Sequence, residues 1–157
     1  MRIELILNGK TEDKYVEDGF TLYEKRLKHY IQFTAVALNS PKAPKLSSPQ
    51  KIMELEADLM EKQFDMDDYV ILLDEHGKEP TSVEFAAYLQ KRMNAGIKKL
   101  VFVVGGPYGF DERIKNRSND KLALSKLTFP HQLVRLVFIE QLYRAFTILR
   151  NEPYHHA

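Results

Sequence analysis

One segment, residues 100–110, constrains the fold of this chain more than any other. It reads Leu-Val-Phe-Val-Val-Gly-Gly-Pro-Tyr-Gly-Phe. Its five consecutive apolar residues, three of them valine, predict a strand that is buried on both faces. Gly105, Gly106 and Pro107 end that strand, and glycine lets another molecule approach the bare backbone. The segment therefore predicts either a ligand-binding loop at a strand end or a tight turn that itself needs glycine.

The rest of the chain alternates predicted strands and helices. Strands are expected at residues 3–7, 32–38, 69–73, 100–104 and 121–124, and helices at 16–30, 48–64, 81–96 and 132–150, with at best a short helix at 111–115. This alternation predicts an α/β fold with a mostly parallel sheet that is covered by helices on both faces. Because parallel strands end at one edge of the sheet, the segments after Leu73, Val104 and Leu124 are expected to meet in one crevice.

Length and composition restrict the class of protein. A chain of 157 residues, 44% hydrophobic and 29% charged, is typical of a single globular domain spanning residues 1–157. It contains no cysteine, which excludes disulfides, thiolate zinc sites and cysteine nucleophiles and agrees with a reducing cytoplasm. The N-terminus lacks the long apolar core of a signal peptide, and no stretch is long enough for a membrane span.

Several familiar catalytic motifs are absent from the sequence. It has neither a Gly-x-x-x-x-Gly-Lys-Ser/Thr loop nor a Gly-x-Gly-x-x-Gly turn after the first strand, which argues against ATP hydrolysis and dinucleotide redox chemistry. It has no Gly-x-Ser-x-Gly elbow and no His-x-x-x-His pair, so a serine nucleophile and a metal site have little support. The remaining classes bind a small cofactor largely through backbone groups or bind a macromolecule.

The last predicted helix is apolar on more than one face, which fits either a subunit interface or a helix buried within one chain. Within it, Glu140 and Arg144 are spaced to form an ion pair.

The formal net charge of the chain is only +1, but two groups of basic residues flank the predicted crevice. The first group is Arg113, Lys115, Arg117, Lys121 and Lys126, and the second is Lys10, Lys14, Lys25, Arg26 and Lys28. Solvated surface is the default interpretation, although two such groups also suit a phosphate backbone.

Three segments together resemble a known family. Phe102–Gly109, with its Gly-Gly-Pro, and Leu124–His131, with its Thr-x-Pro-His, are similar to the SPOUT class of RNA methyltransferases. Arg135–Ala145 and the tail Asn-x-Pro-Tyr-His, Asn151–His155, resemble one member family, the ribosomal RNA large-subunit methyltransferase H family. The match is dense in the C-terminal half and looser in the N-terminal half.

The resemblance implies a fold, a cofactor and partners. The fold is a SPOUT-type α/β domain in which the part from about residue 70 forms a C-terminal trefoil knot and the cofactor site. The cofactor is S-adenosylmethionine, and the reaction is methylation of N3 of a pseudouridine in 23S rRNA of the ribosome by a homodimer with its site between subunits. The implied cofactor contacts lie at the three strand ends: Leu73, Gly105, Leu124, Ser125, Lys126, Leu127, Thr128 and Phe129.

The same resemblance suggests which polar groups lie near the target base. They are His131, Arg144, Tyr154 and His155. Histidine titrates near neutral pH, so His155 is a candidate to remove the N3 proton. Tyr154 can stack on an unpaired base. One departure from the family pattern is His156, where lysine or arginine is expected, and a phosphate contact there would depend more on pH.

Two other interpretations stay open at this point. A non-catalytic ribosome-associated RNA-binding protein could use the same surface, although the intact set of three loops argues against it. A flavodoxin-like nucleotide binder is also compatible with the α/β alternation, and it would give a yellow preparation.

Overall fold

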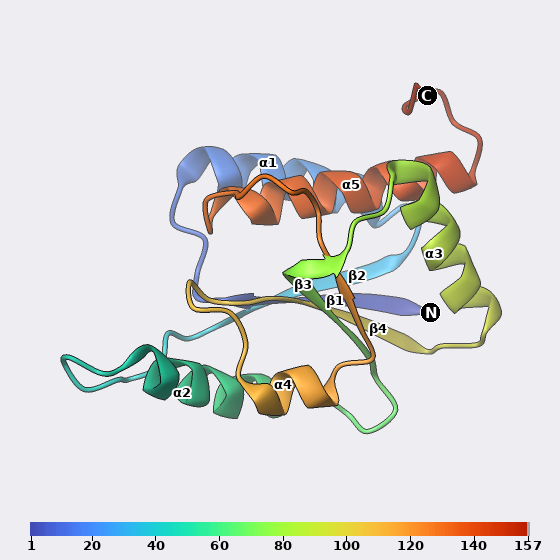
Figure 1. Cartoon of the computed structure of the whole chain (residues 1–157). Helices are drawn as coiled ribbons and strands as arrows, with labels where there is room; N and C mark the ends of the chain where they lie inside the picture. The colour runs from blue at the N-terminus through green and yellow to red at the C-terminus, as the bar shows by residue number, and fades with distance from the viewer. Residues whose placement is uncertain (157) are drawn as a thin grey trace.

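The computed structural model describes residues 1–156 and contains one five-stranded sheet with helices on both sides (Figure 1). The strands are β1 (Arg2–Asn8), β2 (Gln32–Leu38), β3 (Tyr69–Lys78), β4 (Lys99–Val104) and β5 (Asp120–Leu122). The helices are α1 (Lys14–Leu27), α2 (Pro49–Glu61), α3 (Ser82–Asn94), α4 (Glu112–Arg117) and α5 (Leu133–Leu149). The strand order is β2-β1-β4-β3-β5 and all neighbouring strands are parallel, which confirms the predicted α/β class.

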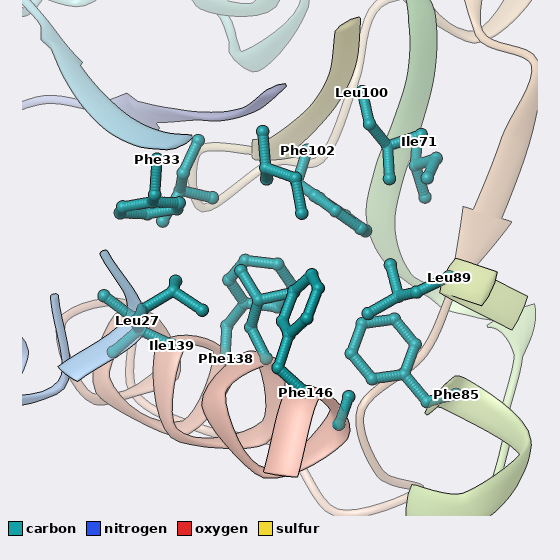
Figure 2. Close-up of a cluster of buried hydrophobic side chains, with 14 of the residues drawn as sticks. Leu27, Phe33, Ile71, Phe85, Leu89, Leu100, Phe102, Phe138, Ile139 and Phe146 are labelled. Atoms are coloured by element: carbon teal, nitrogen blue, oxygen red, sulfur yellow. The ribbon is translucent and has the colours of Figure 1, made fainter. Parts of the chain in front are cut away.

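The sheet separates two layers of helices. Helices α1, α3 and α5 cover one face and α2 and α4 the other, as Figure 1 shows. Strand β4 lies at the centre and is buried at every position, as its run of apolar residues predicts. Figure 2 shows the larger core, where Phe102 of β4 meets Phe138 of α5 with ring centroids 4.8 Å apart. Since α5 packs directly on the central strand, this helix fixes the positions of the loop that precedes it and of the C-terminal tail that follows it.

Local sequence signals set several element boundaries. Ser48 caps α2 by accepting a hydrogen bond from the Lys51 amide at 3.2 Å. Thr81 and Glu84 form the predicted capping box at the start of α3. None of the helices within residues 1–156 is long and apolar enough to cross a membrane.

Other boundaries differ from the sequence prediction. Helices α1 and α2 end at Leu27 and Glu61, so Tyr30 and Phe64 lie beyond them rather than inside. Helix α4 reaches Arg117 instead of Lys115, and β5 is a shorter strand ending at Leu122. These differences of a few residues arise at element ends, where tertiary contacts outweigh local propensity.

Strand β3 runs five residues further than predicted, to Lys78, because of its pairing with β5. Leu122 of β5 lies in register with both Leu73 and Lys78, and the Ala123 amide donates to the Lys78 carbonyl at 2.8 Å. The segment from Leu73 to Lys78 thus bulges around the chain at Leu122. The trefoil knot that the resemblance implies stays a prediction.

Candidate functional site

A cavity of about 590 Å³ lies at the carboxyl edge of the sheet, between the segments that follow β3, β4 and β5. This is the crevice that a parallel sheet with these strand ends predicts. Its lining residues are Leu73–His76, Val104–Phe110, Lys115, Leu122, Leu124–Phe129, His131 and Val134. All eight residues predicted to contact a cofactor are among them, so the structure brings that predicted set together in one place.

The glycine loop has a sterically defined conformation. The Gly109 amide donates to the Gly106 carbonyl at 3.2 Å, closing a turn around Pro107. A Cβ atom at Gly105 would lie 2.9 Å from the buried ring of Phe110, so this position has no room for a side chain. Gly105 is thus required by packing within the turn, and the loop also lines the cavity, so the structure agrees with both interpretations of the glycines.

A buried carboxyl group lies beneath this loop. Glu56 of α2 is 5% exposed. A Cβ at Gly106 would lie 2.6 Å from Oε1 of Glu56 and 2.6 Å from the side-chain nitrogen Nδ2 of Asn8. Burial raises the pKa of Glu56, and within residues 1–156 its Oε2 has no hydrogen-bond partner. Sequence reasoning missed Glu56 because it is one of several acidic residues along an amphipathic helix, and only the folded chain distinguishes it.

His131 lies in the cavity wall and contacts a fully buried guanidinium. Its Nε2 is 2.9 Å from Arg135, which also donates to the Asn8 and Gly9 carbonyls and to the Thr11 hydroxyl. Arginine can only donate, so Nε2 of His131 is the acceptor and the imidazole is neutral. Burial and the Arg135 charge both lower the pKa of His131. Arg135 therefore joins the loop after β1 to α5, and His131 supports it as an acceptor, a positioning role that the sequence pattern of His131 did not indicate.

The His131–Arg135 contact predicts a pH dependence of stability. Below about pH 6.5 the unfolded chain binds a proton that the folded imidazole resists, so the wild type loses stability as the pH falls. A His131→Gln variant keeps an acceptor oxygen, but its side chain does not bind a proton in either the folded or the unfolded chain. In chemical denaturation between pH 8 and pH 5, we expect any stability advantage of the wild type over this variant to shrink as the pH decreases. A stability difference between the two proteins that stays constant from pH 8 to pH 5 would contradict the assignment of a neutral His131 imidazole with a lowered pKa.

The other three predicted catalytic residues form a separate cluster at the far end of α5. Arg144 donates to Glu140, as the helical spacing predicts, and its Nη1 lies 3.4 Å from Nδ1 of His155. The Tyr154 hydroxyl donates to the same Glu140 carboxylate at 3.0 Å. None of these residues lines the cavity, and Arg144 lies about 15 Å along the helix from Val134 in the cavity wall, at 1.5 Å per residue. We name Glu140, Arg144, Tyr154 and His155 the tail cluster.

The tail cluster is held by tyrosines that sequence reasoning treated as helix core or did not single out. Tyr143 meets the Tyr154 ring edge-on at a centroid distance of 4.8 Å, and the Tyr23 hydroxyl lies 3.3 Å from that of Tyr154. Since Tyr154 donates its proton to Glu140, Tyr23 is the donor to Tyr154. Burial and these hydrogen bonds raise the pKa of Tyr154, so its phenol stays protonated and does not act as a base. His156 is exposed and Ala157 lies outside the described residues.

The predicted basic group beside the cavity is partly used in structural contacts. Arg113 pairs with Asp58 and Glu61 of α2, and Arg117 donates to the Asp65 and Asp68 carbonyls. These two side chains join α4 and its flanks to neighbouring elements. They are therefore poor candidates for phosphate contacts.

Comparison with known proteins gives consistent matches along the chain. A family model described as "Predicted SPOUT methyltransferase" matches residues 1–155. The chain is 49% identical over 156 residues to "Ribosomal RNA large subunit methyltransferase H" of Christiangramia forsetii, covering 99% of each chain. It is 51% identical over 156 residues to the protein of the same name from Flavobacterium johnsoniae, again with 99% of each covered.

Proposed function

Because the chain belongs to the family of SPOUT methyltransferases, we propose that it transfers a methyl group from S-adenosylmethionine to N3 of a pseudouridine in 23S rRNA of the assembled ribosome. The observation that carries the proposal is the cavity at the carboxyl edge of the sheet, because it gathers all eight predicted cofactor residues. The identity to large-subunit rRNA methyltransferases over nearly the whole chain supports the RNA substrate.

The cavity has the size and the chemistry that this cofactor needs. Its volume of about 590 Å³ is in the usual range for small-molecule sites. Carboxylates of Asp74 and Glu75 suit an amino group and ribose hydroxyls, and the ammonium groups of Lys115 and Lys126 suit a carboxylate. When bound, S-adenosylmethionine supplies a methyl group that its sulfonium has already activated. The protein's task is then to align that methyl with N3 and to remove the N3 proton.

We propose that each active site is built from two subunits. Within one chain the tail cluster does not line the cavity, and residues of α5 that are apolar but only half-buried, such as Val137 and Leu149, offer a surface for a second copy. A homodimer that places the tail cluster of one subunit over the cavity of the other completes a site with both cofactor and base contacts. This arrangement explains why two groups of functional residues lie at opposite ends of one helix.

Within such a site His155 is the group that we assign to the N3 proton. Its Nδ1 faces Arg144 at 3.4 Å, which is long for a hydrogen bond, so this lone pair is available to a closer donor. When bound, S-adenosylmethionine would supply the methyl group to N3, and Nδ1 of His155 would accept the proton that N3 loses. Arg144, fixed by Glu140, is positioned to contact the base carbonyls, and Tyr154 contributes its ring. Because its substrate is the ribosome, we place the protein in the cytoplasm.

Titration with S-adenosylhomocysteine tests the cofactor assignment. We expect saturable calorimetric binding by the wild type and at least a tenfold loss in a Gly105→Val variant, since its side chain would collide with Phe110 and displace this wall of the cavity. Ala37→Val places the same valine side chain at an exposed position of β2 and should bind like the wild type. Equal binding by both variants would place the ligand elsewhere.

A further inference from the structure

Two arginines beside the tail cluster are held over tyrosine rings and have no other side-chain partner. The Arg26 guanidinium lies 5.6 Å from the centroid of Tyr23 and 5.8 Å from that of Tyr143. The Arg150 guanidinium lies 4.6 Å from the centroid of Tyr30. Within residues 1–156 neither side chain makes a hydrogen bond or an ion pair, and both are exposed. Their N–H donors are therefore oriented by stacking but not used.

The other arginines around the molecule differ in this respect. Five of them donate to acceptors of the protein itself, and their donors are committed to the fold: Arg92, Arg113, Arg117, Arg135 and Arg144. Arg2 is also exposed, at the start of β1, which lies on the same side of the molecule as the C-terminal end of α5 (Figure 1), but within residues 1–156 it makes no contact with an aromatic ring. Within residues 1–156, Arg26 and Arg150 are thus the two arginines whose guanidinium groups lie over tyrosine rings and make no hydrogen bond, so their donors are free to bind something outside the chain.

These two arginines lie near the residues that the proposed function places at the target base. Tyr23 and Tyr143, below Arg26, both contact Tyr154. Tyr30, below Arg150, packs against Tyr143 at a centroid distance of 5.8 Å and donates to Glu152 of the tail. The Arg26 guanidinium therefore lies one aromatic ring away from Tyr154, and the Arg150 guanidinium lies two rings away, through Tyr30 and Tyr143.

Nearby acidic side chains already have partners. Glu140 is bound by Arg144 and Tyr154, Glu152 by Tyr30, and Glu24 pairs with Lys28 at 3.4 Å. None of them neutralises Arg26 or Arg150 in this structure. Glu140 and Glu24 each have a cationic partner, whereas Glu152 is bound by a neutral phenol and keeps its charge; the guanidinium donors of Arg26 and Arg150 are nevertheless unused.

We propose that Arg26 and Arg150 bind backbone phosphates of nucleotides next to the methylated base. A planar guanidinium pairs with a phosphate through two parallel hydrogen bonds, and stacking on a tyrosine holds it ready for this geometry. The proposal rests on the proposed function for the identity of the RNA. It adds the residues that bind its backbone and explains how a chain with a net charge of only +1 holds a polyanion: the positive charge is local.

The test compares Arg26→Gln and Arg150→Gln with the wild type in binding to ribosomes and in methyl transfer. We expect each variant to weaken ribosome binding in cosedimentation about tenfold and to raise KM for ribosomes by a similar factor. The kcat and the affinity for S-adenosylhomocysteine should not change. Each loss should also reduce the dependence of log affinity on log salt by about one unit or slightly less. Lys62→Gln removes an exposed charge at the end of α2, on the other face of the sheet, and should leave these quantities unchanged.

Three results would overturn the proposal. One is unchanged ribosome affinity and salt dependence in both variants. Another is an equal effect of Lys62→Gln, which would indicate bulk charge rather than these two contacts. The third is loss of the dimer in sedimentation velocity, which would make the arginines subunit contacts. Cosedimentation reports on RNA binding even if the wild type transfers no methyl group, so a failure of the proposed function is separately visible.

Discussion

Replacing Gly77 with alanine is expected to destabilise the protein by about 2–3 kcal/mol, the upper part of the range for overpacked sites, and to abolish measurable binding of S-adenosylhomocysteine. A Cβ at this position would lie 2.6 Å from the backbone nitrogen of Leu122 and 2.6 Å from the carbonyl carbon of Lys121. Backbone atoms of a paired strand cannot rotate away, so the β3 bulge and β5 must separate. Because both segments continue into walls of the cavity, the ligand site is expected to be lost with the pairing.

Gly19→Ala is the matched control for this prediction. Its Cβ would also be crowded, at 2.8 Å, but the neighbour is a terminal methyl of Leu136, which can move. Alanine also favours the helix over glycine by about 1 kcal/mol, which offsets the crowding. Urea denaturation and calorimetry of both variants provide the measurement. A Gly77→Ala protein with wild-type stability and affinity would show that the enclosure of Leu122 is not close.

Mixing two inactive variants is expected to restore methyl transfer. A Gly105→Val subunit retains its tail cluster, and a Tyr154→Ala subunit retains its cavity, so a heterodimer contains one complete site. After random reassociation of equal amounts, half of the dimers are mixed and each has one of two sites intact, which gives about a quarter of the wild-type activity. Each variant alone is expected to be nearly inactive, since every one of its sites lacks either the cofactor or Tyr154.

A second mixture distinguishes the arrangement in which the tail acts on its own subunit. When the wild type is mixed with the double variant Gly105→Val/Tyr154→Ala, a composite site leaves heterodimers without any complete site. Only wild-type homodimers are then active, about a quarter of the total. If each cavity instead used its own tail, this mixture would keep about half of the activity and the first mixture would gain none.

Much of the fold could be predicted because its signals are local. The strand at residues 32–38 and the capping box of Thr81 and Glu84 depend on hydrophobic pattern and cap chemistry, and both agree with the structure. The cavity could also be anticipated, since three segments that follow parallel strands must meet at one edge of the sheet. The particular lining residues followed from resemblance to a family and not from the pattern alone.

The remaining features depend on contacts between distant parts of the chain. Strand β3 continues to Lys78 because β5, more than 40 residues later, pairs with it after a bulge. Glu56 becomes a buried carboxyl under the glycine loop only when α2 packs below Gly106. Likewise, Tyr23 of α1 shares the helical pattern of core residues, and its contact with Tyr154 spans 131 positions. No local rule of sequence contains this information.

Methyl transfer to ribosomes tests the central claim most directly. Purified protein is incubated with S-adenosylmethionine carrying a labelled methyl group and with ribosomes that lack the modification, and the product is mapped by mass spectrometry. We predict one labelled methyl group per 23S rRNA, on N3 of a pseudouridine, with poor transfer to ribosomes in which that uridine has not been isomerised. No incorporation by a protein that binds both S-adenosylhomocysteine and ribosomes would contradict the account and favour a non-catalytic ribosome-binding protein.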